Sequence, residues 1–482
     1  MLIKNAECLG SSPNRYFSLS QQDVRCDQGI VVAMGKLTPA PEEKVMDAAG
    51  ALLLPGLHDH HVHIASYAAS LRSVFCGPPE VSTETALIKQ LNETNQADHW
   101  FRGIGYHESV AGDIDRRWLD AHGPQKPVRI QHRTGRLWIL NSPALEVIRD
   151  TPTGKMSAER RSMLDVENGR LYDVDDLLRE VTRSATLPIA KASENLASFG
   201  VTGINDMTAS NDLDTFRWFS GLQDQGVLLQ KLRLSGTSEL SESRSESSSD
   251  ARLPPNSKLQ IGETKIHLHE SDLPDFYHLC RIISSSHGLN RAVAVHCVTE
   301  TELVFTLAAL REAGIRPGDR IEHASVVPPD VLEQIREVNL CVVTQPNFIL
   351  DRGETYLEEI PENEHLWLYR CQSLIDRSVP LAFGTDLPFG NPDPWVAIKS
   401  ATLRQTGSGD VLGKGELMTA EAALSCFLGE LERPAQPRSI AVGEAADFCL
   451  LNAPWHVARL ELSSSLVRAT ILDGELIYQR KL

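Results

Sequence analysis

Residues 55–63 read PGLHDHHVH and follow an apolar run, so a buried strand ends in four histidines within six residues. Side chains alternate across a strand, which places Asp59, His61 and His63 on one face and the other two histidines on the opposite face. Two imidazoles that are two residues apart on one face can chelate one metal ion. Neutral imidazole suits zinc and the other divalent ions of the first transition row. A polar strand end with solvated histidines is the alternative if this segment is taken alone.

The middle of the chain alternates short apolar strands with helical stretches such as 300–313 and 329–338. Seven strands are predicted after the histidine segment, at residues 203–207, 231–235, 264–269, 292–296, 320–324, 341–345 and 381–386. Together with the histidine strand they give eight β/α units. This pattern predicts an α/β fold, a (β/α)8 TIM-type barrel with its functional side chains at the carboxyl ends of the strands.

Both ends of the chain are rich in predicted strands. Residues 1–54 and 436–482 are expected to form one small β-sandwich domain, and residues 55–435 the barrel. The interval between the first two barrel strands is much longer than a usual βα connection, so residues 66–198 are expected to form an inserted α/β subdomain. The Ser- and Glu-rich stretch 236–257 is expected to be a mobile surface loop.

Composition limits the classes of function. The 482 residues, 41% hydrophobic and 23% charged, are typical of a soluble globular protein with two or three structural units. A net charge of −17 argues against nucleic acid or an anionic membrane as partner. No signal peptide and no membrane-spanning run is recognised. Nine cysteines without a CxxC pair favour reduced thiols. We expect a cytoplasmic protein, with a homodimer as the default assembly.

Three of the later predicted strands end in a residue of a type that binds metals. His296 ends the strand 292–296, His323 follows Arg-Ile-Glu, and Asp386 ends the strand 381–386. One such residue would be read as a core histidine or a helix cap, but three of them downstream of a His-x-His pair are difficult to explain by packing. Because barrel strands converge at their carboxyl ends, we expect these groups to meet the first pair.

With these motifs the chain resembles the amidohydrolase superfamily of metal-dependent hydrolases over nearly its full length. The shared features are the β unit built from both ends, the histidine motif at 55–63, single histidines on two later strands and an aspartate on the last strand. Within the superfamily the chain is most similar to the branch of the N-substituted formamide deformylases. This likeness is carried by the segments 100–106 (WFRGIGY), 137–145 (LWILNSPAL) and 199–202 (FGVT).

The resemblance implies a centre of one or two divalent ions, with Zn²⁺ as the preferred metal. The implied ligands are His61, His63, Lys265, His296, His323 and Asp386. The first two histidines would share the more buried ion with Asp386, and the two later histidines would hold a second ion. Lys265 would bridge the ions as a carbamate formed with carbon dioxide, because a cationic amine would be repelled there. A lysine that reaches solvent or pairs with an acid is the alternative.

The implied activity is hydrolysis of a carbon–nitrogen bond other than a peptide bond, in a small molecule such as an N-acyl or N-formyl amine. A metal-activated hydroxide would attack, with Asp386 as the catalytic proton shuttle to the leaving amine. A mononuclear deaminase of the same superfamily, for which Glu270 is the candidate acid, and a hydrolase of cyclic amides or esters stay open. A non-catalytic relative is the other alternative, and the complete set of ligand positions argues against it.

The chain departs from the branch at two places. Arg136 stands where relatives usually carry a histidine, and it is expected either to contact an anionic substrate group or to form a surface ion pair. His269 and Glu270 stand where relatives usually carry Asp-Gly, and we expect them to contact the substrate. His267 and His269 share a strand face with Lys265, so that service as metal ligands instead of Lys265 stays open as an alternative. Both departures concern the substrate, which the sequence does not name, and they leave the ligand set intact.

Overall fold

The chain folds into two compact units. The computed structural model describes residues 1–10, 18–78, 80–93, 99–150, 167–172, 174, 177–178, 187–240 and 258–481. One unit consists of Met1–Ile64 together with Ser193–Leu482, and the other is Ala65–Ala192. Most of the predicted surface loop at 236–257 lies outside the described residues.

The larger unit contains a barrel of eight parallel strands in the order β18-β17-β16-β15-β14-β13-β12-β6. A parallel bridge between Val62 and Leu387 links the first strand to the segment that follows the last one, so the barrel is nearly closed. The barrel strands are β6 (Leu57–Val62), β12 (Val201–Asp206), β13 (Lys231–Gly236), β14 (Leu259–His267), β15 (Val293–Cys297), β16 (Arg320–His323), β17 (Cys341–Thr344) and β18 (Leu381–Phe383). Helices cover the sheet, which explains why the strands are mostly buried apolar runs. The predicted TIM-type barrel is confirmed.

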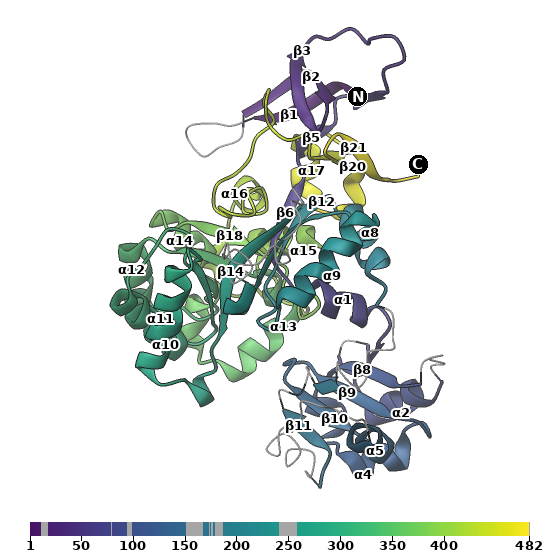
Figure 1. Cartoon of the computed structure of the whole chain (residues 1–482), viewed down its shortest axis with the longest axis vertical. Coiled ribbons are helices and arrows are strands. Elements are labelled where there is room, and N and C mark those ends of the chain that lie inside the picture. Colours follow the sequence, from purple (N-terminus) through teal and green to yellow (C-terminus); the bar gives the residue numbers. More distant parts are fainter. Residues whose placement is uncertain are drawn as a thin grey trace, which may run out of the picture. The chain divides into compact units, whose positions relative to one another are not determined.

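Helices follow the barrel strands and surround them, as Figure 1 shows for α10, α11 and α12. They are α8 (Ile189–Ser198), α9 (Leu213–Asp224), α10 (Phe276–Gly288), α11 (Glu300–Ala313), α12 (Pro329–Val338), α13 (Asn347–Glu359), α14 (Cys371–Asp376), α15 (Pro394–Leu403) and α16 (Ala420–Ser425). A further helix, α17 (Trp455–Glu461), lies between two strands of the second sheet, β19 and β20. Short 3₁₀ turns lie at Glu270–Asp272, Glu362–Trp367, Lys414–Glu416 and Ser464–Leu466. A capping box between Thr299 and Glu302 starts α11 and fixes the chain directly after β15.

A second sheet combines strands from both ends of the chain, in the order β21-β20-β19-β5-β1-β2-β3 with β4 beside β1 (Figure 1). Its strands are β1 (Leu2–Gly10), β2 (Ser18–Asp27), β3 (Ile30–Gly35), β4 (Val45–Asp47), β5 (Leu52–Pro55), β19 (Phe448–Leu451), β20 (Val467–Leu472) and β21 (Glu475–Gln479). Ile3, Val24, Phe448 and Ile471 belong to its buried core. The expected β unit from both termini is confirmed, and β5 leads through Gly56 into the histidine strand β6.

The smaller unit has its own sheet, in the order β11-β10-β9-β8-β7. Its elements are α1 (Ile64–Ser70), β7 (Val74–Phe75), α2 (Glu84–Glu93), β8 (Phe101–Tyr106), α3 (Glu108–Ala111), α4 (Arg116–His122), β9 (Val128–His132), β10 (Leu137–Leu140), α5 (Ser142–Asp150) and β11 (Arg170–Tyr172). Apolar side chains such as Phe101, Leu119 and Ile130 form its core. This confirms the expected α/β insertion between the first and second barrel strands.

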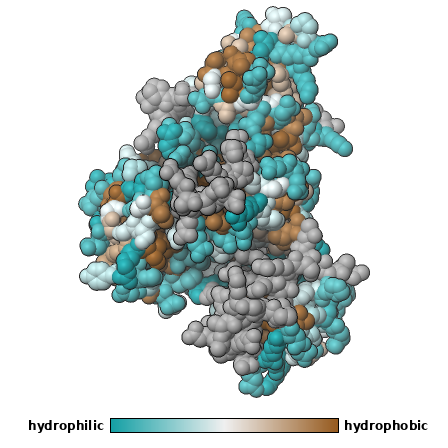
Figure 2. All heavy atoms as spheres, in the orientation of Figure 1, coloured by the Kyte–Doolittle hydropathy of each residue, from teal (hydrophilic) through white to brown (hydrophobic). Residues whose placement is uncertain are grey.

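The surface of the protein is mixed in polarity. Among the residues coloured by hydropathy in Figure 2, hydrophilic ones predominate and hydrophobic ones form smaller groups among them. Within the described part of the chain, none of the helices has the length and apolar character needed to span a bilayer.

Candidate metal centre

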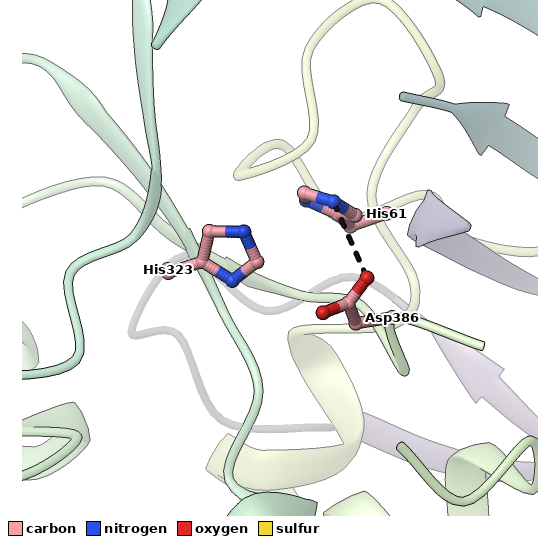
Figure 3. A group of neighbouring side chains, drawn as sticks. All are labelled: His61, His323 and Asp386. Atoms are coloured by element: carbon pink, nitrogen blue, oxygen red, sulfur yellow. Dashed lines mark ion pairs between the residues drawn. The ribbon is translucent and has the colours of Figure 1, made fainter. Parts of the chain in front are cut away.

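Three side chains from distant parts of the sequence meet at the carboxyl ends of the barrel strands. They are His61 on β6, His323 at the end of β16 and Asp386 just after β18, and Figure 3 shows them pointing toward one another. One ligand atom from each lies within 4.8 Å of the other two, and all three residues are buried. His61 Nε2 is 3.6 Å and His63 Nε2 is 3.3 Å from Asp386 Oδ1. Such a group of two imidazoles and a carboxylate suits a divalent ion.

The backbone turns sharply at two of these residues. His323 has φ of +71° and Asp386 has φ of +57°, both in the left-handed region that costs residues other than glycine about 1–2 kcal/mol. At His323 the turn interrupts the strand alternation, so that Glu322 and His323 both reach the His61 ring although they are neighbours in sequence. Strain of this kind at a ligand group indicates a site that the rest of the fold holds in place.

A glycine lets the last barrel strand approach the first one closely. A Cβ atom at Gly384 would lie 2.6 Å from the backbone nitrogen of His61, so no larger residue fits without a backbone shift. Next to it, the carboxylate of Asp59 accepts hydrogen bonds from Thr385 N at 2.9 Å and from Thr385 Oγ1 at 2.6 Å. Asp59 therefore ties the histidine strand to the segment that carries Asp386.

Each of three imidazoles is oriented by a hydrogen bond at its Nδ1 atom. The pairs are His61 with Glu322 Oε2 (2.6 Å), His63 with Thr208 Oγ1 (2.8 Å) and His323 with Gln345 Oε1 (2.8 Å). A carboxylate and an amide oxygen only accept hydrogen bonds, so the Nδ1 atoms of His61 and His323 carry the proton. The lone pair of each ring is then on Nε2, which is the arrangement found for histidines that bind metals.

Two further barrel residues hold the His61 ring in place through hydrogen bonds. Glu322 also accepts a bond of 2.5 Å from Arg320 Nε, and Arg320 Nη2 donates to the carbonyl oxygen of His60 at 2.9 Å. Arg320, Glu322 and His61 are each at most 1% exposed. These three residues form a buried chain that holds the first histidine in one orientation.

The protonation states of the site favour metal binding. Burial lowers the pKa of His61 well below its usual value, and the charge of Lys265 adds to this effect. Burial likewise lowers the pKa of His323. Although burial alone would raise the pKa of Asp386, the surrounding imidazoles hold it below its usual range. Neutral imidazoles beside an ionised carboxylate are the protonation states in which these groups bind a metal.

Unpaired polar atoms at this site fit a divalent ion. Asp386 Oδ1 has no hydrogen-bond donor among the described residues, although two Nε2 atoms lie within 3.6 Å of it. Because the His61 ring is protonated at Nδ1, its Nε2 lone pair faces the carboxylate, and a cation would stabilise that arrangement. Lys265 Nζ is also buried and without a hydrogen-bond partner in the described part of the chain, and burial lowers its pKa. Its environment suits an uncharged amine or a carbamate.

The remaining predicted ligand, His296, extends the group along the barrel. Its ring lies 4.4 Å from that of His323, between centroids, so the predicted second histidine pair is adjacent to the first group. On the next strand, His267 lies 4.3 Å from His296 and 4.4 Å from His269. Glu270 follows, and its carboxylate accepts a hydrogen bond from Thr301 Oγ1 at 3.0 Å. The structure thus brings His269 to the edge of the histidine group.

Arg136 lies in the other unit. It is half-buried in the connection between β9 and β10 of Ala65–Ala192, and its side chain is not without an interaction partner. The residues that orient the imidazoles, Thr208, Glu322 and Gln345, were not predicted from the sequence. Glu322 had one visible signal, its position directly before a strand-end histidine.

The comparisons with known proteins agree with this geometry. The model of the amidohydrolase family matches residues 44–478. An N-substituted formamide deformylase of Arthrobacter pascens is 24% identical over 94% of this chain and 95% of its own length. A putative amidohydrolase of Bacillus subtilis, YtcJ, is 20% identical over 92% of each chain. The crystal structure of an uncharacterised metal-dependent hydrolase from Pyrococcus horikoshii superposes with a TM-score of 0.72, at 21% identity, over 94% of this chain and 97% of that one.

A nearly closed β/α barrel with a histidine–aspartate group at the carboxyl ends of its strands defines the class of metal-dependent barrel hydrolases. The family match covers most of the chain, and the chain belongs to the amidohydrolase family. The resemblance inferred from the sequence motifs is confirmed at this level. The chain is accordingly a hydrolase with a small-molecule substrate.

Proposed function

We propose that the protein hydrolyses the carbon–nitrogen bond of a non-peptide amide, an N-acyl or N-formyl amine. The observation that carries the proposal is the convergence of His61, His323 and Asp386 with both Nε2 lone pairs free. The similarity to a formamide deformylase over 94% of the chain supports the choice of bond. The proposed ligands of one or two ions, zinc by preference, are His61, His63, Lys265, His296, His323 and Asp386.

A divalent ion bound here supplies Lewis acidity, which activates water and polarises a carbonyl group. The imidazoles of the centre are held ready by their Nδ1 hydrogen bonds. Asp386 is the proposed proton carrier, since its carboxylate is ionised, faces the ligand group and has an oxygen without a donor. It takes a proton from the attacking water and returns it to the nitrogen of the leaving amine.

Lys265 is proposed to join the ions as a carbamate. The amine is buried within the ligand group and its depressed pKa favours the uncharged form, which is the form that reacts with carbon dioxide. Attack of Nζ on carbon dioxide would form an N–C bond and release one proton from the nitrogen to solvent, and the resulting carbamate would offer carboxylate-like oxygens to two cations. A carbamate would also explain why Nζ of Lys265 is buried without a hydrogen-bond partner in the described part of the chain.

Substrate recognition is assigned to residues outside the ligand set. His269 and Glu270 follow the end of β14, and the ring of His269 lies 6.0 Å from that of His296, between centroids. Both residues are proposed to contact the substrate. Arg136 is proposed as a contact for an anionic substrate group. The nine cysteines are all free thiols, which supports a cytoplasmic protein, and a homodimer is the proposed assembly.

The proposal is tested by assaying the purified chain on N-formyl amines, N-acyl amines, cyclic amides, esters and aminated heterocycles, before and after treatment with a chelator. We expect release of an amine from an acyclic amide, loss of this activity with the chelator and its return with Zn²⁺. The D386N variant, in which the carboxylate becomes an amide of similar size, serves as the matched inactive control. Release of ammonia from an aminated heterocycle would instead support the deaminase alternative, and turnover that survives metal removal would overturn the proposal.

A further inference from the structure

One face of helix α13 contacts the chain segment that follows β18 and carries Asp386. Asn347 Nδ2 donates a hydrogen bond to the carbonyl oxygen of Thr385 at 3.0 Å. The Asp351 carboxylate accepts a hydrogen bond from the backbone N–H of Asn391 at 2.9 Å. Because Asn347 and Asp351 are four positions apart, they lie on one face of the helix. The helix therefore fixes this segment on both sides of Asp386.

Arg352 on the same helix also contacts this segment. Its Nη2 atom donates a hydrogen bond to the carbonyl oxygen of Phe389 at 3.1 Å, and its guanidinium carbon lies 4.1 Å from the centroid of the Phe348 ring. Arg352 forms no ion pair with an acid among the described residues, whereas Arg377 in the same unit pairs with Glu333 at 2.6 Å. A ring face and one carbonyl oxygen use few of the five N–H donors of a guanidinium, so Arg352 can still bind an anion.

A single aromatic ring connects Arg352 with the metal group. The Phe389 ring lies 5.5 Å from that of His63, between centroids and edge to face, and His63 Nε2 is 3.3 Å from Asp386 Oδ1. Arg352, Phe389 and His63 are each half-buried, so solvent reaches this side of the metal group. A molecule held at the metal group can therefore extend past Phe389 to the guanidinium.

We propose that Arg352 binds a carboxylate of the substrate while the amide bond lies at the metal group. The inference rests on the proposed function, because it takes the amide to be the bond that is cleaved. A guanidinium can donate two parallel hydrogen bonds to a carboxylate, and such charged bonds are stronger than those between neutral groups. The substrates are then amides that carry a carboxylate away from the bond that breaks. Unlike Arg136, Arg352 belongs to the same unit as the metal group.

The alternative is a purely structural role. Arg352 would then only hold the segment after β18 through the Phe389 carbonyl group, with its charge balanced by Asp351, on which it acts electrostatically. The two roles differ in what they predict for a charged and an uncharged substrate. Loss of a structural contact lowers turnover of both, whereas loss of an anion contact weakens binding of the charged one.

The test compares amides in pairs that differ only in charge. N-formyl ω-amino acids of increasing length are each paired with the N-alkylformamide of equal length, and kcat/KM is measured for the full chain. The wild-type chain is expected to favour the carboxylate member of at least one pair. R352Q is expected to lower this preference about 10- to 100-fold through KM. The matched control is R377Q, which removes the paired guanidinium in the same unit and is expected to keep the preference.

A wild-type chain without a preference for the carboxylate would overturn the inference, and so would an R352Q protein that keeps the preference. Circular dichroism checks the fold. If R352Q does not fold, R352K takes its place, because an ammonium group cannot form two parallel bonds with a carboxylate; an unchanged preference in R352K has the same meaning. If the wild-type chain cleaves no amide, the proposed function fails by itself. The preference is then read from the dissociation constants of both members of each pair, measured by calorimetry with the metal-loaded chains.

Discussion

Replacing Glu322 by glutamine tests how the protein orients its first histidine. Glu322 accepts one bond from His61 Nδ1 at 2.6 Å and another from Arg320 Nε at 2.5 Å, and it is completely buried. Glutamine has the same shape but only one oxygen. If that oxygen accepts from Arg320, the amide N–H₂ group faces Nδ1 of His61. Since both groups would then be donors, the His61 proton moves from Nδ1 to Nε2, and Nε2 loses the lone pair that would bind metal.

The size of this effect follows from both contacts. Loss of an orienting partner of a metal-binding histidine lowers metal affinity about 10- to 100-fold, or about 1.4–2.7 kcal/mol. Breaking a buried ion pair by removing one partner costs about 3–5 kcal/mol of folding stability. Because glutamine keeps one oxygen for Arg320, the loss of stability in E322Q is expected near the lower end of this range. The assay is zinc affinity by competition with a chromogenic chelator, combined with urea unfolding of the metal-free chain.

A matched control separates orientation of the ligand from general stability. Glu416 is another buried glutamate, paired with Arg370 at 3.4 Å and bound by the backbone N–H of Ser373 at 2.8 Å. E416Q is expected to lower stability while leaving zinc affinity unchanged. If E322Q folds and binds zinc as tightly as the wild-type chain, the orienting role assigned to Glu322 is wrong.

Three other perturbations have defined outcomes. D386N is expected to lower turnover about 10²- to 10⁴-fold while most of the metal stays bound, and a D386N protein with wild-type turnover would exclude the proton-carrier role. After incubation with ¹³C-bicarbonate, the metal-loaded chain is expected to show a carbamate signal in ¹³C NMR that is absent from K265A; the same spectrum from both would contradict the bridge. Backbone N–H groups of Asn5 and Leu37 bind the Asp23 carboxylate, and these bonds lower its pKa. Its stabilising effect is therefore present above the unfolded value of about 4 and is lost as the pH falls through the lower folded value. Urea unfolding should accordingly show a loss of stability in D23N at neutral pH that shrinks in acid, and a difference independent of pH would refute this.

The fold and the meeting of His61, His323 and Asp386 could be predicted because both depend on local patterns. Apolar runs that end in a ligand residue specify a strand and its exposed end, and parallel barrel strands bring such ends together. His61, His323 and Asp386 therefore could be expected to meet, although more than 300 positions separate the first from the last.

The orienting partners could not be predicted in this way. Glu322 reaches His61 across the barrel interior from β16 to β6. This contact also depends on the positive φ of His323, which cannot be predicted from the residue type. Thr208 follows β12, the neighbour of β6, and Gln345 follows β17, the neighbour of β16. Both lie in segments with no ligand-like pattern. The role of Arg136 depends on the structure of the inserted unit, because the pattern of the branch has a histidine at this position and predicts nothing for an arginine.

The most direct test of the account is the position of the metal itself. The experiment uses crystals of the zinc-loaded chain, measured on both sides of the zinc absorption edge. The anomalous peak is predicted to place a zinc ion within bonding distance of Nε2 of His61, Nε2 of His63 and the carboxylate of Asp386. The Nδ1 atoms should keep their contacts with Glu322 and Thr208. A zinc-loaded crystal without a peak at these atoms, or with zinc bound at Nδ1, would contradict the assignment of the catalytic centre.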